Sequence, residues 1–328
     1  MDPKSPEFMK TMLDLRARAL AENQCHESQL KNALDLQYWR KLNPDMTICG
    51  EKSAVPATIP AVDPSVVETP LRMMFTFGFF ELPAIVSGPT LEQMRRCFDV
   101  IRDEGWPTGF VFIYDEFWRA FRGPVLARFL TGALGEGYRQ LPYIWGHYVP
   151  PNSHGWRPHV DGPPFSGKLT VWLALTDATL ENGCMYVLPR NSQTEKITDR
   201  YLETESFERA DALSLLQHSR ALPAAAGSCL GWGPNVIHWG SVSGPSAPAR
   251  LSISVEFASR DMNPPDEGLT ILDADPAAPL PTFVTRLQLI ASEIKHYEGH
   301  FEAGLLASQS LAKEILQRTH AESATPSA

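Results

Sequence analysis

Residues 159–192 have the sequence HVDGPPFSGKLTVWLALTDATLENGCMYVLPRNS, and this stretch decides the fold. Between positions 168 and 176, Leu and Val alternate with Lys, Thr, Trp and Ala, which is typical of a half-buried β-strand. Asn182-Gly183 is typical of a tight turn, and the short apolar run 184–188 follows it. We therefore expect two strands joined as a β-hairpin.

A second alternating segment, RLSISVEF, spans residues 250–257. Its Leu, Ile, Val and Phe side chains share one face, while Arg250, Ser252, Ser254 and Glu256 share the other. An arginine at the start of a core-forming strand points into a polar interior, where its planar guanidinium can bind a carboxylate through two hydrogen bonds. Ser252 can donate a further hydrogen bond to that anion. The alternative is an edge arginine that pairs with Glu256 or another acid.

Three potential metal ligands flank these strands. His159 and Asp161 lie two residues apart, so on an extended segment both point to the same side and can bind one ion. His238 follows Asp161 by 238 − 161 = 77 residues, so it must reach the site from a remote strand. Two histidines and one carboxylate on one face of a metal ion are the ligand pattern of non-haem Fe(II) oxygenases. The spacing alone is unspecific, and the alternative for His159 is a loop or core histidine.

Residues 159–192, together with GWGPNVIHWGSVSGPSAPARLSISVEF at residues 231–257, resemble the signature of the phytanoyl-CoA dioxygenase family. The first two ligands, the NGC turn, the VLP-type strand, the distal histidine and the later arginine occur in the family's order. The resemblance covers about the central third of the chain and implies an Fe(II)- and 2-oxoglutarate-dependent oxygenase. The fold class that it implies is mainly β with surrounding helices, built on a double-stranded β-helix (jelly-roll, cupin-like) core.

The resemblance also implies roles for single residues. The residues that would hold Fe(II) and form the catalytic centre are His159, Asp161 and His238. The candidates for binding the cosubstrate are Arg250, Ser252, Trp172, Thr170 and Ser241. Arg250 would bind the far carboxylate of 2-oxoglutarate, and Trp172 matches a tryptophan that lies near the cosubstrate in relatives. Ser241 matches a serine that follows the distal histidine.

The implied reaction uses O2 and converts 2-oxoglutarate to succinate and CO2 while a second molecule is oxidised. In related halogenases the metal-binding carboxylate is replaced by Gly or Ala, so the presence of Asp161 favours hydroxylation, or a related desaturation or rearrangement. The sequence has no basic cluster suited to CoA or phosphate. We therefore expect a small metabolite or a natural-product intermediate as the substrate.

Side chains close to the ligands in sequence are candidates for substrate contact: Trp156, Arg157, His147 and Trp239. The alternative for His147 is a solvated or structural histidine, and the alternative for Trp156 is packing under the loop. Trp239, like Trp232, can instead pack in the core or at the rim. Residues 194–222 are expected to form a lid or insertion over the mouth of the site, because this region varies most among relatives.

Two other classes of function remain open at this level. One is a cupin-type metalloenzyme that does not use 2-oxoglutarate, such as a cofactor-independent dioxygenase or a zinc hydrolase. Arg250 and Trp172 argue against it, because neither is needed there. The other is a non-catalytic jelly-roll binding protein, which the complete ligand set argues against.

Composition and charge indicate which classes of partner and which cellular setting to expect. The net charge of 29 − 38 = −9 argues against a nucleic-acid-binding protein, which is usually basic. Five widely spaced cysteines show neither a zinc motif nor a disulfide framework, which favours a reduced, cytoplasmic setting. No apolar run is as long as a membrane span, and the N-terminus lacks a signal-peptide core. The expected partner is a small-molecule substrate, and the protein association that we expect is a homodimer.

The chain is expected to form one oxygenase domain over residues 9–320, after an expression-tag remnant and before a loose tail. The boundaries that we expect are 1–8 for the remnant, 9–135 for a helical N-terminal part, about 70–260 for the β-helix core, 281–319 for C-terminal helices and 321–328 for the tail.

Hydropathy and turn signals give a coarse map of local structure. We expect helices over residues 9–42 and 115–134, and a helix over residues 90–104. The Pro- and Val-rich residues 55–70 are expected to be extended, and residues 73–82 are expected to form a strand.

Overall fold

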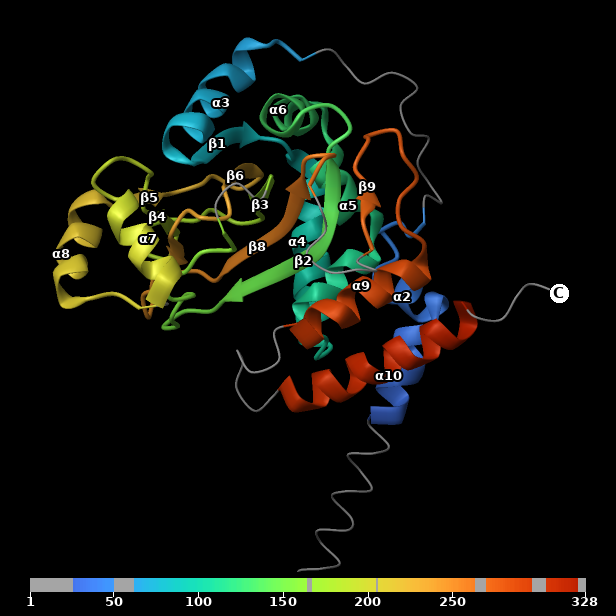
Figure 1. Ribbon diagram of the computed structural model, residues 1–328. Coiled ribbons are helices and arrows are strands. Elements are labelled where there is room, and N and C mark those ends of the chain that lie inside the picture. The colour runs from blue at the N-terminus through green and yellow to red at the C-terminus, as the bar shows by residue number, and fades with distance from the viewer. Residues whose placement is uncertain are drawn as a thin grey trace, which may run out of the picture. The chain divides into compact units, whose positions relative to one another are not determined.

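The computed structural model describes residues 26–49, 62–163, 167–204, 206–262, 270–296 and 305–323 (Figure 1). By their internal contacts these residues divide into two units. One unit comprises Asp45–Pro281 and contains all of the strands, and the other combines parts of Met1–Pro44 and Thr282–Ala328. The predicted ligands all lie in the strand-containing unit.

A six-stranded antiparallel sheet forms the centre of the strand-containing unit. Its strands occur in the order β1 (Phe79–Ala84), β6 (Ser228–Trp232), β3 (Lys168–Ala174), β8 (Arg250–Ala258), β2 (Arg139–Val149) and β9 (Leu272–Asp273). The two alternating segments of the sequence, β3 and β8, are direct neighbours. Thr170 lies opposite Glu256, and Trp172 lies opposite Ser254. Because paired residues point to the same side, the polar face of β8 continues across β3.

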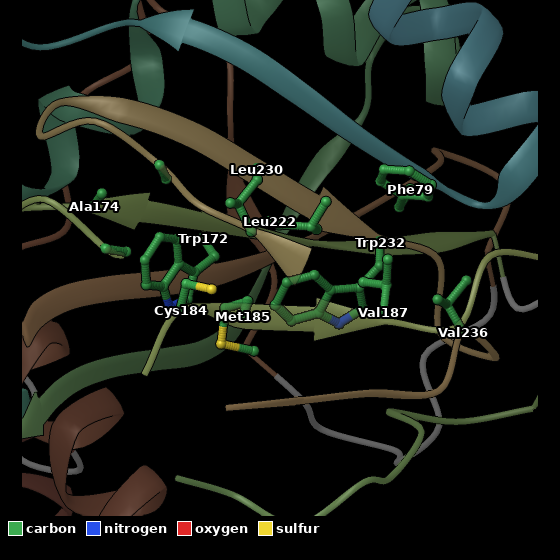
Figure 2. Packing of buried hydrophobic residues seen from close by; sticks show 12 residues of the cluster. Phe79, Trp172, Ala174, Cys184, Met185, Val187, Leu222, Leu230, Trp232 and Val236 are labelled. Carbon is green, nitrogen blue, oxygen red and sulfur yellow. The ribbon is translucent and has the colours of Figure 1, made fainter. Parts of the chain in front are cut away.

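A three-stranded antiparallel sheet faces the large one. It consists of β5 (Arg220–Leu222), β4 (Met185–Val187) and β7 (His238–Gly240). Buried apolar side chains from both sheets form one cluster, and Figure 2 shows Trp172, Leu230 and Trp232 together with Met185 and Val187. Burial of this cluster holds the two sheets against each other, at roughly 25 cal/mol for each Å² of apolar surface removed from water.

The predicted hairpin between β3 and β4 is wrong. The two strands do not pair, because β3 belongs to the large sheet and β4 to the small one. Asn182 closes the intervening turn by accepting a hydrogen bond from the Thr179 amide (2.7 Å) and donating one to the Asp177 carbonyl (2.8 Å). Gly183 adopts a left-handed conformation (φ 82°), which reverses the chain as expected. The turn therefore carries the chain from one sheet to the other.

Helices and 3-10 turns flank the large sheet on its other side. The elements are α4 (Gly88–Asp103), η1 (Thr108–Ile113), α5 (Asp115–Arg119), η2 (Ala120–Arg122) and α6 (Pro124–Leu134). The apolar face of β8, which includes Leu251, Ile253, Val255 and Phe257, is buried. The single helix predicted over residues 115–134 is interrupted, because Gly123 is extended before Pro124 begins α6.

The segment before β1 is helical where an extended chain and an earlier strand were predicted. Helix α3 spans Ser65–Phe77, so β1 begins only at Phe79. The Asp63 carboxylate accepts a hydrogen bond from the Ser65 amide (2.9 Å), and Gly78 ends the helix with a φ of 81°. The expectation for residues 55–61 lies outside the described residues.

The described parts of the second unit consist of helices and short connections. Residues 26–34 form a helix, and Asp35 ends it and caps the next helix, α2 (Leu36–Leu42). The predicted C-terminal helices are α9 (Phe283–His296) and α10 (Leu305–Ser323). Within the unit, the His26 ring lies 2.8 Å from a Glu314 carboxylate oxygen. The part of the predicted helix 9–42 that precedes residue 26 lies outside the described residues.

The fold is therefore a mixture of helices and antiparallel sheets. The described ranges contain more helical than strand residues, so "mainly β" understates the helices. The described helices include none with the length and apolar character that a membrane span requires.

Gly231 in β6 provides a test of this packing. An added Cβ at Gly231 would overlap the Thr170 carbonyl oxygen on β3 and approach the Phe80 ring to 2.7 Å, whereas at Gly233 the closest atom, in Met74, is 3.4 Å away. We expect Gly231→Ala to lower the free energy of unfolding by about 2 kcal/mol, as overpacking typically does. Gly233→Ala should cause no such loss. Urea unfolding of both variants measures the difference, and equal stabilities would contradict the close approach of β6 and β3.

Candidate active site

The two segments that bear the predicted ligands are paired through their backbones. The His159 amide donates to the His238 carbonyl (3.0 Å), and the His238 amide donates to the His159 carbonyl (2.9 Å). Two residues later, the Asp161 amide donates to the Pro234 carbonyl (2.8 Å). The extended segment 159–161 is thus joined to β7 and to the turn before it. This pairing places both histidines side by side, with ring centroids 4.2 Å apart.

His159, Asp161 and His238 present three ligand atoms that all lie within 4.8 Å of one another. The Asp161 Oδ1 atom is 3.7 Å from His159 Nε2 and 3.5 Å from His238 Nε2. His238 is buried, while His159 and Asp161 are partly accessible. Two imidazole nitrogens and one carboxylate oxygen are a donor set that suits Fe(II) and leaves positions free for other ligands.

The remaining ring nitrogens orient both histidines. His159 Nδ1 lies 2.8 Å from the Arg157 carbonyl, and His238 Nδ1 lies 2.9 Å from the Val236 carbonyl. Because a carbonyl can only accept, each Nδ1 donates, and the lone pair of a neutral ring is left on Nε2. Burial lowers the pKa of His238 below its ordinary value, which keeps this ring neutral and able to bind a metal.

The second carboxylate oxygen of Asp161 accepts two hydrogen bonds. Thr170 Oγ1 donates to Oδ2 at 2.7 Å, and the Trp232 indole Nε1 donates to the same atom at 2.9 Å. Burial acts to raise the pKa of Asp161, but the neighbouring histidines and these two hydrogen bonds outweigh it, so the pKa is lowered overall. Asp161 is therefore held as a carboxylate.

Arg250 is buried on the same face of the large sheet. Its guanidinium lies 5.7 Å from the centre of the Trp172 ring and donates a hydrogen bond to the Gly183 carbonyl. Burial lowers the pKa of Arg250 to about 10, so it remains charged at neutral pH. Among the described residues, no carboxylate forms an ion pair with Arg250, so the alternative of a pairing with Glu256 is not observed. A buried cation without a counterion is suited to an anionic ligand.

Two further polar side chains lie beside Arg250. Ser252 is fully buried, and its hydroxyl has no hydrogen-bond partner among the described residues. His147 lies opposite Ser252 on β2, and its Nε2 is 3.0 Å from the Ser254 hydroxyl. Burial, and secondarily the charge of Arg250, lower the pKa of His147 well below its ordinary value. This end of the sheet face therefore has one positive charge and neutral hydrogen-bonding groups.

An ion pair occupies the other end of the same face. Lys168 Nζ lies 2.8 Å from Glu256 Oε2, and both side chains are about 15% exposed (16% and 15%). Glu256 lies opposite Thr170, which itself binds Asp161. Burial raises the pKa of Glu256 to about 7, although Lys168 acts in the opposite direction. The carboxylate of Asp161 thus lies between a cationic end and a dipolar end.

The substrate candidates occupy different places. The Trp156 ring is 6.0 Å from the His159 ring and 6.4 Å from the Trp145 ring, so it forms part of an aromatic wall beside the triad. Arg157 is exposed, and it is its backbone carbonyl that orients His159. The Ser241 amide donates to the Cys184 carbonyl (3.1 Å) just beyond β7. These observations place Trp156 at the triad. They give no contact between the triad and Ser241.

Trp239 packs away from the triad. It stacks on Tyr186 (ring centroids 5.5 Å, interplanar angle 17°), because alternate residues of β7 point to opposite faces. On that outer face it joins an apolar cluster with side chains from α7 (Glu195–Thr204) and α8 (Arg209–His218). The cluster consists of Leu188, Ile197 and Ile237, packed by Val160, Tyr201, Phe207, Leu215 and Trp239. The predicted insertion 194–222 therefore contacts the metal-ligand loop.

Two features of the site were missed at the sequence level. Trp232 was interpreted as a core or rim residue, Lys168 received no role, and Glu256 was named only as an alternative partner of Arg250. The alternation of β3 and β8 placed Lys168 and Glu256 on the polar faces of their strands. The register that makes them neighbours is not encoded locally, so the pair could not be anticipated. No sequence signal connected Trp232 with Asp161.

Comparison with protein families identifies the chain. The model of the phytanoyl-CoA dioxygenase (PhyH) family matches residues 78–243, which is just over half of the 328 residues and includes all three ligands. The chain belongs to the phytanoyl-CoA dioxygenase family. This confirms the predicted family and enzyme class, and with them non-haem iron and 2-oxoglutarate as the cofactors of the family. No significant match was found among curated protein sequences.

Solved structures resemble this family member at low identity. They include the α-ketoglutarate-dependent epimerase SnoN from nogalamycin biosynthesis (17% identity, 67% of this chain and 97% of that one, TM-score 0.48). The carbocyclase SnoK from the same biosynthesis has 20% identity over 68% and 97% of the two chains, with a TM-score of 0.48. HygX from Streptomyces hygroscopicus, with nickel and 2-oxoglutarate bound, has 14% identity over 61% and 88%, also with a TM-score of 0.48. This likeness carries no conclusion about the substrate.

The Lys168–Glu256 pair predicts a particular dependence of stability on pH. Because the folded-state pKa of Glu256 is raised to about 7, its contribution to stability is full at low pH and is lost as the pH rises through that value. In Lys168→Met the opposing charge is gone, so the pKa should rise further. Between pH 5.5 and pH 8 this variant should lose about 1 kcal/mol more free energy of unfolding than the parent, which corresponds to roughly one pKa unit.

Urea unfolding at the two pH values measures this difference. Lys168→Met combined with Glu256→Gln is the matched control, because it retains the first change and removes the titrating group. The additional loss should disappear in the double variant. If the free energy of unfolding fell equally with pH in the parent and in Lys168→Met, the pKa of Glu256 would not depend on Lys168.

Proposed function

We propose that this protein is an Fe(II)- and 2-oxoglutarate-dependent dioxygenase that hydroxylates a small metabolite or natural-product intermediate. The observations that carry this proposal are the His159–Asp161–His238 triad and the buried Arg250, which has no ion-pair partner among the described residues and lies on the same sheet face as the Lys168–Glu256 pair. The two facing sheets support the finer assignment of a double-stranded β-helix core. Members of the family share the cofactor requirement.

His159, Asp161 and His238 would hold the iron through Nε2, a carboxylate oxygen and Nε2. Bound iron with 2-oxoglutarate supplies the oxidising chemistry, in which O2 is consumed and succinate and CO2 are released. The chain keeps the ligands in the correct state beforehand, because the Nδ1 hydrogen bonds leave both Nε2 lone pairs available. The negative charge of Asp161 then partly neutralises the ion.

Arg250 would bind the far carboxylate of 2-oxoglutarate. It is buried, charged and beside the Ser252 hydroxyl, whose hydrogen-bonding capacity is unused among the described residues. Trp172 forms a wall of this subsite under the guanidinium. The charges balance, because a divalent ion and Arg250 offset Asp161 and a dianionic cosubstrate. This balance explains why a site in a chain of net charge −9 can accept a dianion.

The substrate would lie along Trp156 and Trp145, with the Lys168–Glu256 pair at the end of the sheet face away from Arg250. The aromatic rings offer an apolar contact surface, and the ion pair offers both a donor and an acceptor without net charge. This combination suits an uncharged ring compound better than a CoA thioester. Helices α7 and α8 would limit access of water, since they pack on Val160 in the metal-ligand loop.

Hydroxylation is favoured over halogenation because Asp161 retains its place beside both histidines. Trp156 at the triad supports a substrate role for that residue, while Trp239 faces the other way and is better assigned to packing. The cytoplasmic setting and the homodimer stay predictions, and the four described cysteines are free thiols, as a reduced setting requires.

The test is an anaerobic titration of metal-free protein with Fe(II) and 2-oxoglutarate, followed through the weak visible charge-transfer band of the iron chelate. His159→Ala should abolish the band. Arg250→Ala should weaken the affinity for 2-oxoglutarate about 10- to 100-fold, which corresponds to the loss of a charge-assisted contact of roughly 1.5–3 kcal/mol.

Arg209→Ala is the matched control, because this exposed arginine of α8 lies outside the sheet face. Its titration should equal that of the parent. A parent protein that contains iron but gives no band would remove 2-oxoglutarate from the mechanism and favour a cupin-type metalloenzyme of another kind.

A further inference from the structure

We propose that Trp232 and Thr170 are positioning residues that hold Asp161 as a one-oxygen metal ligand. This inference deepens the proposed function and rests on it. The two side chains occupy one carboxylate oxygen and leave the other free, and the choice of oxygen is the same for both donors. Neither residue is a metal ligand itself.

The geometry divides the carboxylate into two halves with different tasks. Oδ1 faces the Nε2 atoms of both histidines, at 3.5 and 3.7 Å. Oδ2 points away from them and accepts from Thr170 Oγ1 and Trp232 Nε1 at 2.7 and 2.9 Å. An indole N–H is a donor only, so Trp232 can be satisfied here only by an acceptor. Rotation of the carboxylate to present both oxygens to the metal would break both hydrogen bonds.

The two donors belong to the rigid part of the molecule. Thr170 on β3 and Trp232 on β6 lie directly opposite each other in the large sheet, and Phe79 on β1 lies opposite Trp232 from the other side. Both donors are buried, and the Trp232 ring packs on the His238 ring with centroids 4.2 Å apart. Asp161, by contrast, lies in the loop that precedes β3. The two donors on the sheet therefore hold the Asp161 carboxylate of the loop in place.

The consequence concerns the number of free coordination positions. An octahedral ion bound by two histidines and one carboxylate oxygen keeps three positions free. These suffice for a 2-oxo acid that binds through two atoms and for O2. A carboxylate that bound through both oxygens would occupy one of the three. By holding Oδ2, Trp232 and Thr170 preserve the position that the second reactant needs.

Metal affinity measured without 2-oxoglutarate tests this inference. The variants are Trp232→Phe and Thr170→Val, which keep the ring or the shape and remove one donor each. Competition between the protein and a chelator for Co(II) gives the dissociation constant. We expect each variant to bind Co(II) about 10-fold more weakly and the double variant about 100-fold more weakly, as loss of outer hydrogen bonds typically does. Thr170→Ser, which retains the hydroxyl, should restore the parental affinity.

Trp118→Phe is the matched control for the loss of a buried indole hydrogen bond. Its Nε1 donates to the Phe112 carbonyl (2.6 Å) in the helical layer, so it should lower the free energy of unfolding without changing the affinity for Co(II). Co(II) absorption adds a second readout. Its intensity reports coordination geometry and should change in Trp232→Phe and Thr170→Val but not in Trp118→Phe.

Affinities within twofold of the parent in both Thr170→Val and the double variant would overturn the inference. If Trp232→Phe fails to fold, the comparison of Thr170→Val with Thr170→Ser still decides the question. The proposed function would fail if the 2-oxoglutarate band were absent. The Co(II) measurement uses only protein, chelator and metal, so its outcome is independent of that band.

Discussion

The reciprocal backbone hydrogen bonds between His159 and His238 are the constraint on which the site depends. They join a loop that follows β2 to the short strand β7, and every later feature follows from that junction. With the two segments paired, Asp161 reaches β3 and β6 of the large sheet, where Thr170 and Trp232 donate hydrogen bonds to its carboxylate. Without this pairing, His238 would remain in β7 through its pairing with β4, but nothing in the backbone would hold His159 beside it. The fold thus acts on the chemistry first through its backbone and only then through side chains.

One strand organises the charges around that junction. Arg250 and Glu256 lie on the same face of β8, six positions apart in sequence, and the register with β3 places Thr170 opposite Glu256 and Trp172 opposite Ser254. The result is a line from a cation, through the metal-binding carboxylate, to a dipolar pair. Buried charges of this kind persist only where they have partners. Glu256 has Lys168, and Asp161 has the two histidines, whereas among the described residues Arg250 contacts a carbonyl, a sulfur and a ring but no carboxylate. The sheet face is therefore positively charged at the Arg250 end and has no net charge at the Lys168–Glu256 end.

The sequence predicted the parts of this arrangement that depend on local periodicity. The alternation in 250–257 gave the correct strand and the correct polar face, and the two-residue spacing gave the common direction of His159 and Asp161. Pairing between distant segments was not predictable in the same way. The chain passes between sheets after β3, so the hairpin expectation failed, and the indole of Trp232 reaches Asp161 only because β6 happens to lie beside β3. Helix α3 was missed because its Pro70 suggested an extended chain, although the Asp63 and Gly78 signals marked both of its ends.

Helices α7 and α8 lie between two residues that are themselves cross-strand partners, since Val187 of β4 pairs with Arg220 of β5. The segment therefore leaves the small sheet at Val187 and returns to it at the paired residue Arg220, so its two ends are held together by the sheet. Closing such a loop depends weakly on its length, with about 0.6 kcal/mol for each doubling. Insertions, deletions or exchange of the whole segment can thus reshape the entrance while the two strands that fix the triad keep their register. In this architecture, the segment at the entrance can change while the strands that hold the metal ligands stay the same.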